Sequence, residues 1–169
     1  MTAAHARAIA ETFASLFASE LPTTRKVLQA VGHGDSAYTP DPKSRTAWGL
    51  ALHLATADVW FLDCIINGHF ATDAEKVRAL EGSFKTADDV VAFYDTAMTE
   101  RIAALRALPD DALTRQVSFF GMFAKPAVEF LPMANNHSIH HRGQLAAYLR
   151  PMGSKVPSIY GSSADEGRG

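Results

Sequence analysis

The sequence contains a single cysteine, no excess of positive charge and no long apolar run, and each shortage excludes a class of protein. Cys64 alone cannot form an internal disulfide, which fits a reducing compartment. The 16 basic and 18 acidic residues give a net charge of −2, so no basic surface for nucleic acid or an anionic membrane is predicted. Charged residues interrupt every apolar stretch before the roughly 18 residues of a membrane span. The first ten residues also lack the apolar segment of a secretion signal. We therefore expect a cytoplasmic protein with no nucleic-acid or membrane partner.

The sequence does contain enough apolar material for one core. It has 169 residues, of which 47% are hydrophobic, and about 150 residues is a common length for one domain. We expect a single domain over residues 1–169, with an ordered core at about residues 7–160 and an irregular C-terminal tail from about residue 154. Seven histidines accompany the one cysteine, so imidazole is the abundant metal-binding group.

Four segments place apolar residues at the spacing of an amphipathic α-helix, and no run alternates for long enough to demand a strand. They span about residues 7–31, 44–66, 86–109 and 126–150. Proline predicts a kink at Pro22 and a bend near Pro132. Ser44 and Thr86 are the expected N-terminal caps of the second and third helices. With residues 118–125 as a Phe-rich loop, the pattern predicts an all-α protein built as a four-helix bundle.

The last predicted helix has polar residues on the face expected to point into the core. Steps of four and three along this face pass through Phe130, Ala134, His137, His141, Gln144 and Tyr148. A buried imidazole without a partner costs about 1–3 kcal/mol for each unsatisfied group, so the two histidines need a reason to be there. Because residues four apart lie about 5–6 Å apart at Cβ, both imidazoles can reach one metal ion. A buried, hydrogen-bonded pair is the alternative. His140 lies one step off this face and should point elsewhere.

His53 offers a third imidazole, from the second predicted helix. It lies in the otherwise apolar segment 48–55 (WGLALHLA), where a lone polar side chain needs an internal partner. Three imidazoles from two helices would leave one or more coordination positions for water or substrate, as in catalytic metal sites. A satisfied core histidine remains the alternative for His53.

The residues around these histidines have simpler interpretations as well. Gln144 and Tyr148 could orient a metal-bound water or ligand, or could belong to the core. A glycine in the middle of a helix destabilises it by about 1 kcal/mol relative to alanine, so Gly143 predicts the close approach of another segment. The Phe-rich loop could pack on the end of the bundle or line an apolar substrate pocket.

Two separated parts of the chain resemble the DinB family. Residues 137–145 (HSIHHRGQL), 148–150 (YLR) and 156–161 (VPSIYG) closely resemble its C-terminal signature, and residues 42–46 (PKSRT), leading to His53, resemble its second-helix motif. The resemblance implies an up-down-down-up, DinB/YfiT-like four-helix bundle that holds a divalent metal with His53, His137 and His141. Tyr160 lies within the last motif and could fold over the open face of that metal. Some relatives are thiol-dependent S-transferases or metal-dependent hydrolases, and many have no assigned reaction.

Three functions remain open from the residues and the resemblance. The first is an enzyme with unknown catalytic residues that acts on a small-molecule substrate. Its metal activates either a low-molecular-weight thiol, which is transferred to the substrate, or water, which hydrolyses it. The second is a non-catalytic, stress-associated metal-binding or interaction protein that acts as a homodimer. The third is a bundle with buried histidines and no metal. Three imidazoles suit zinc or nickel, with iron and manganese as alternatives. Any reactive thiol is expected to come from solution, because the chain has only Cys64.

Overall fold

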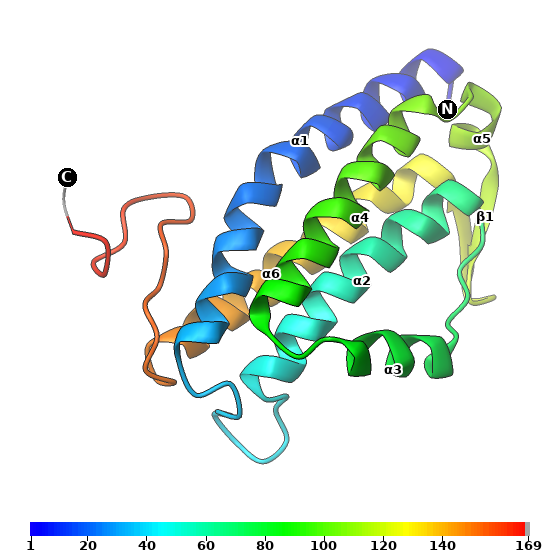
Figure 1. The fold of residues 1–169 in the computed structure, drawn as a ribbon. Coiled ribbons are helices and arrows are strands. Elements are labelled where there is room, and N and C mark those ends of the chain that lie inside the picture. Colours follow the sequence, from blue (N-terminus) through cyan, green and yellow to red (C-terminus); the bar gives the residue numbers. More distant parts are fainter. Residues whose placement is uncertain (168–169) are drawn as a thin grey trace.

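Four long helices make up most of the structure, a computed structural model that describes residues 1–167 (Figure 1). They are α1 (Ala3–Ala30), α2 (Ala47–Asn67), α4 (Ala87–Ala107) and α6 (Leu131–Leu149). Helices α1 and α2 each pack against both α4 and α6, so the core lies where the four apolar faces meet. Six α-helices occur in the described residues, which confirms the prediction of a mostly helical protein.

The shorter elements differ from the prediction. Two short helices, α3 (Ala74–Ser83) and α5 (Asp110–Thr114), were not expected. The predicted Phe-rich loop is an antiparallel hairpin of β1 (Gln116–Phe119) and β2 (Phe123–Pro126), so the expectation of no strand is wrong here. Strand β1 (QVSF) alternates polar and apolar residues over the shortest length that can show it, and β2 (FAKP) does not alternate. The turn also uses Phe120 at φ 51° beside Gly121 at φ 77°, and a phenylalanine seldom adopts this left-handed conformation.

The N-terminal cap of α2 is Thr46, two residues after the predicted cap, Ser44. The Thr46 hydroxyl accepts a hydrogen bond from the Gly49 N–H at 3.0 Å, whereas the hydroxyl of Ser44 donates to Asp41. The prediction for α4 is confirmed, because Thr86 and Asp89 form a reciprocal capping box. In both cases a hydroxyl satisfies a backbone N–H that the helix itself leaves free.

Neither Pro22 nor Pro132 interrupts its helix, and the kink at Pro22 stays a prediction. Helix α1 continues through Pro22 from Ala3 to Ala30, and a 3₁₀ turn (Val31–His33) follows it. A second 3₁₀ turn (Ala127–Phe130) precedes α6, so the expected helix start at Pro126 is wrong. Pro132 lies in the first turn of α6, where its missing N–H breaks no helical hydrogen bond, so no bend is required.

Helix α2 is the most apolar helix and lies in the core. One 18-residue window has a mean hydropathy of 1.5, enough in length and composition for a membrane span, but 67% of that window is buried inside the fold. Core packing accounts for this apolar character. The same helix carries the buried polar groups Thr56 and Asp58.

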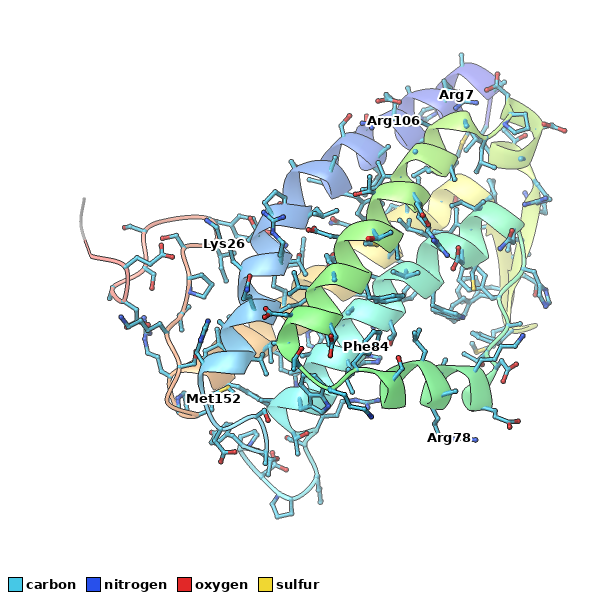
Figure 2. The ribbon with its side chains drawn as sticks, in the orientation of Figure 1. Arg7, Lys26, Arg78, Phe84, Arg106 and Met152 are labelled. Carbon is cyan, nitrogen blue, oxygen red and sulfur yellow. The ribbon has the colours of Figure 1, made fainter. Side chains whose placement is uncertain are left out.

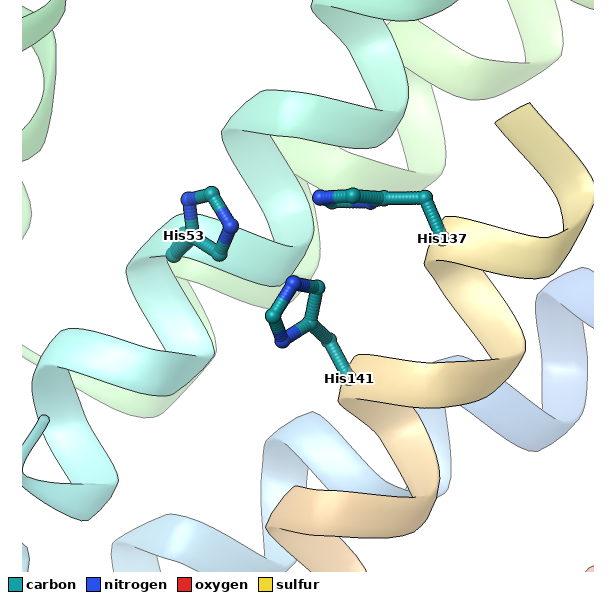
Figure 3. A group of neighbouring side chains, drawn as sticks. All are labelled: His53, His137 and His141. Carbon is teal, nitrogen blue, oxygen red and sulfur yellow. The ribbon is translucent and has the colours of Figure 1, made fainter. Parts of the chain in front are cut away.

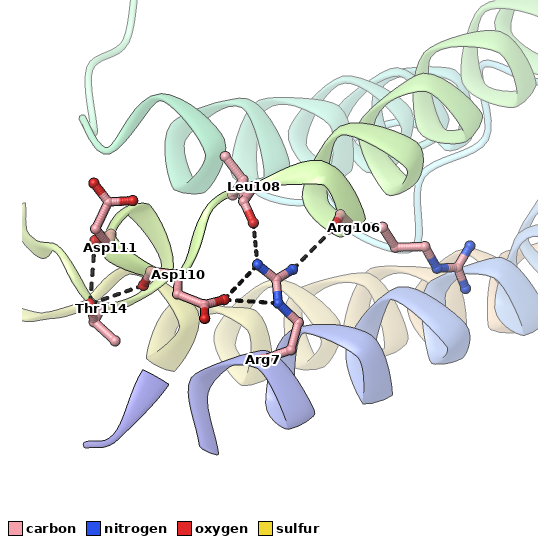
Figure 4. Close-up of polar contacts among 6 residues, drawn as sticks. All are labelled: Arg7, Arg106, Leu108, Asp110, Asp111 and Thr114. Carbon is pink, nitrogen blue, oxygen red and sulfur yellow. Dashed lines mark hydrogen bonds and ion pairs between the residues drawn. The ribbon is translucent and has the colours of Figure 1, made fainter. Parts of the chain in front are cut away.

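The N-terminal end of α1 is fastened to the segment that joins α4 to α5 (Figure 4). The Arg7 guanidinium donates to the backbone carbonyls of Arg106, at 3.0 Å, and Leu108, and pairs with the Asp110 carboxylate at 2.8 Å. These contacts cross about a hundred residues of sequence and hold the ends of three helices together.

The segment after α6 has no helix or strand up to residue 167, as predicted for the tail, and it lies beside the C-terminal half of α1 (Figure 1). The Ser154 hydroxyl donates to the Ala30 carbonyl at 2.6 Å, and Arg150 pairs with Asp165 at 2.9 Å. The tail is thus held by polar contacts to α1 and to the end of α6.

Candidate metal centre

Three histidines meet between α2 and α6, where the two helices pack together (Figure 3). His53 comes from α2, and His137 and His141 come from consecutive turns of α6. One ring nitrogen of each lies within 4.8 Å of one ring nitrogen of the others. The ring centroids are 5.2 Å apart for His53 and His137, 4.6 Å for His53 and His141, and 4.4 Å for His137 and His141. The structure therefore brings together the three residues that the sequence proposed as metal ligands.

The surroundings of His53 and His141 lower the pKa of both rings and so favour their neutral form. Burial lowers the pKa of His53 to about 4, and the positive charge of Arg45 and the other two imidazoles act in the same direction. Burial also lowers the pKa of His141, although its contact with Gln144 opposes the shift. A metal ion needs the lone pair of an unprotonated ring nitrogen, so these shifts favour metal binding near neutral pH.

A buried carboxylate that the sequence analysis missed lies behind His137. Asp58 is 4% exposed, and its Oδ1 lies 3.7 Å from Nδ1 of His137. Both atoms lack a hydrogen-bond partner in the described structure, whereas Oδ2 accepts hydrogen bonds from the hydroxyls of Tyr94 at 3.0 Å and Ser138 at 2.7 Å. Metal-binding histidines commonly donate their second ring N–H to a carboxylate, which fixes the tautomer. Asp58 is placed to do this, leaving Nε2 of His137 for an ion.

The other predicted neighbours of the histidines divide into two groups. Gln144 belongs to the site, because its Oε1 lies 3.1 Å from Nδ1 of His141 and can hold that ring in place. Tyr148 is buried in the core and packs edge-on against Tyr38 at a centroid distance of 5.6 Å. His140 is exposed and stays outside the three-histidine group, as predicted.

The structure does not bring Tyr160 to the histidines. Its hydroxyl donates to Glu20 of α1 at 2.9 Å and accepts from Arg142, the residue next to His141. Arg142 is only 1% exposed and reaches away toward α1, where it pairs with Glu20 at 2.5 Å and donates to Thr24 at 2.9 Å. Tyr160 therefore covers a buried cation between α1 and α6, and its expected position over the metal is not observed.

The expectation of a close contact at Gly143 is wrong. This glycine is exposed, and a Cβ atom added to it would meet no atom within 4 Å. No neighbouring helix or tail segment in the described structure explains its place in α6.

A cavity of about 380 Å³ borders the histidine cluster on the side of α3. His53 and His137 line it together with apolar residues of α2, including Trp60 and Phe61. The hairpin reaches this region as well, since Phe120 stacks on Trp60 at a centroid distance of 6.2 Å. Two of the three imidazoles, those of His53 and His137, thus face a space large enough for a small molecule.

Comparisons with known proteins agree with this fold. The family model described as the DinB family matches residues 4–168. The uncharacterized protein YjoA of Bacillus subtilis is 26% identical over 148 residues, covering 86% of this chain and 92% of YjoA. The crystal structure of that DinB-like protein superposes with a TM-score of 0.67 at 24% identity, over 89% of this chain and 98% of the other. A DinB-like protein from Bacillus cereus gives a TM-score of 0.70 at 26% identity, over 88% and 95%. Because the family model spans almost the whole sequence, the chain belongs to the DinB family.

Proposed function

We propose that this protein binds one divalent transition metal through His53, His137 and His141 and uses it to act on a small molecule. The observation that carries the proposal is the convergence of three ring nitrogens within 4.8 Å from two packed helices. Imidazole ligands suit zinc or nickel first, with iron and manganese as alternatives.

The donor set fits such an ion. Within residues 1–167, no cysteine or carboxylate joins the group of three histidines, which leaves coordination positions for a ligand from solution. Asp58 lies against Nδ1 of His137, and Gln144 lies against Nδ1 of His141, as expected of residues that orient metal ligands. A buried pair of hydrogen-bonded histidines would not require a third imidazole or a carboxylate behind one ring.

The reaction that this arrangement supports best is the transfer of a thiol to a small electrophile or the hydrolysis of that electrophile by water. When bound, the metal would lower the pKa of a thiol or water and so supply a nucleophile near neutral pH. The chain has no obvious thiol nucleophile of its own, since burial raises the pKa of Cys64 to about 11. A thiol substrate would therefore be a low-molecular-weight one.

The remaining expectations about the whole molecule belong to the same proposal. We infer an up-down-down-up arrangement of the four long helices, as in DinB/YfiT-like bundles, in a single domain. A homodimer in the cytoplasm remains our prediction for its assembly and location, and the molar mass in solution tests the first of these.

Metal analysis of protein purified without a histidine tag tests the site. We expect about one metal ion per chain in the wild type and loss of that ion in His141→Ala. His140→Ala is the matched control, because His140 is an exposed histidine on the same helix. Equal metal content in all three proteins would refute the three-histidine site.

Turnover of a low-molecular-weight thiol with an electrophilic acceptor tests the enzymatic part. The rate should require the metal and should be lost in His137→Ala. Metal binding without metal-dependent turnover on a broad substrate panel would favour the alternative, a non-catalytic, stress-associated metal-binding protein.

A further inference from the structure

The cavity beside the histidines has three kinds of wall. One wall is the candidate metal centre, through His53 and His137. A second is the apolar and aromatic surface of α2, and the third is the inner side of α3. Among the remaining lining residues are Arg45, Thr56, Trp60, Phe61, Val77 and Glu81. The volume of about 380 Å³ lies near the lower end of the 300–1,000 Å³ typical of ligand pockets, so it suits a small molecule.

The aromatic wall is held in a fixed position. The indole N–H of Trp60 donates to the Ala71 carbonyl at 2.7 Å, and the Trp60 ring packs edge-on against Phe61 at 4.8 Å. Phe120 of the hairpin stacks parallel to the indole at 6.2 Å. A side chain fixed by a hydrogen bond and two aromatic neighbours loses little entropy when a ligand packs on it. This wall therefore favours a ligand with an apolar or aromatic body.

The cavity is lined by one basic and one acidic side chain, Arg45 and Glu81. Arg45 lies directly before the N-terminal cap of α2, and within residues 1–167 its guanidinium makes no hydrogen bond or ion pair. Glu81, from α3, lies 3.2 Å from the Thr56 hydroxyl, whose single proton is shared with the Leu52 carbonyl at 2.8 Å. The N-terminal end of α2 adds partial positive charge near Arg45. The cation is thus a charged group available to a ligand.

Helix α3 is the weakly held wall. None of its residues is buried. It is linked to α2 by the contact between Thr56 and Glu81, while Val77 faces the cavity. A wall with so little buried surface can move at small cost, which gives a ligand a way in.

We propose that the cavity binds small molecules with an apolar body and a carboxylate, the body packing on Trp60 and the carboxylate pairing with Arg45. This names the substrate class of the proposed function and rests on that function for its chemistry. The binding itself uses Arg45 and Trp60, neither of which is among the three histidines.

Three probes that share a phenylpropyl group and differ in charge test this inference. They are 3-phenylpropanoate, 3-phenylpropanol and 3-phenylpropylammonium, and their binding is measured by calorimetry and by ligand-detected NMR on metal-stripped protein. The anion should bind most tightly. Arg45→Gln should weaken the anion about three- to tenfold and leave the alcohol unchanged, because only the carboxylate pairs with the guanidinium. Arg78→Gln removes the same charge from α3 outside the cavity, where Arg78 points away from α2, and should change nothing (Figure 2).

The outcomes separate this inference from the metal proposal. Binding of 3-phenylpropanoate to the metal-stripped wild type would support the cavity independently of the ion, and it should persist in His141→Ala because His141 does not line the cavity. Equal binding of the three probes, or the same loss in Arg45→Gln and Arg78→Gln, would overturn it even if the metal site is correct. Trp60→Ala should weaken all three probes alike, and unchanged binding there would refute the aromatic wall, once circular dichroism shows that the variant is folded.

Discussion

Replacing the Asp58 carboxylate with an amide should weaken metal binding without removing any of the three ligands. Asp58→Asn keeps the size and shape of the side chain, and the amide oxygen can still accept the hydrogen bonds from Tyr94 and Ser138. The amide nitrogen, however, then stands in place of Oδ1, 3.7 Å from Nδ1 of His137. Because an N–H group can only donate, the variant favours the tautomer that carries its proton on Nε2, where the metal is expected to bind.

The size of the effect follows from the role of residues that orient metal ligands. Their loss typically weakens metal binding about 10- to 100-fold, which corresponds to about 1.4–2.7 kcal/mol. The contact between Asp58 and His137 must shorten by about 0.8 Å to become a normal hydrogen bond. The lower half of that range is therefore the better expectation. Since Asp58 is 4% exposed, solvent screens the contact little.

Competition with a chromophoric zinc chelator measures this effect directly. We expect the dissociation constant of Asp58→Asn to rise at least tenfold over that of the wild type, while circular dichroism of the metal-free protein stays the same. Asp63→Asn is the matched control, since Asp63 is on the same helix and pairs with Arg101 at 3.0 Å, with 40% of its side chain exposed. A dissociation constant for Asp58→Asn that equals the control would refute the role of the carboxylate.

Two further pairs of variants test the fold by urea unfolding. Glu20→Gln leaves the buried guanidinium of Arg142 without its carboxylate and should lower the free energy of unfolding by about 3 kcal/mol. Glu11→Gln removes an exposed ion pair with Arg106 and should lower it by less than about 1 kcal/mol. Equal costs would show that burial does not decide the contribution of these ion pairs. Gly143→Ala should stabilise the exposed middle of α6 by about 0.5–1 kcal/mol. Gly68→Ala should destabilise, because Gly68 ends α2 at φ 70°; a stabilised Gly68→Ala would contradict this.

The sequence predicted the elements whose signal extends over many residues. The four long helices each repeat an apolar spacing over about 20 residues, and the two histidines of α6 are related by that same spacing. Helix α3 was missed because it buries none of its residues and so carries no apolar stripe. The hairpin was missed because its strands are only four residues long. Helix α3 lines the cavity and the hairpin packs on its Trp60 wall through Phe120, so the surroundings of the site were less predictable than its histidines.

Asp58 and Arg142 show why the partners of a site are harder to predict than its ligands. Asp58 is an acid in an apolar helix, and by the argument applied to His53 it also required an internal partner. The sequence shows that Asp58 needs a partner but does not show which residue it is, because His137 lies 79 residues further along the chain, on another helix. Likewise, Arg142 follows His141 directly but faces α1, since neighbouring positions on a helix point about 100° apart. A buried charge therefore predicts that a polar contact exists, while the packing of the helices decides which residue makes it.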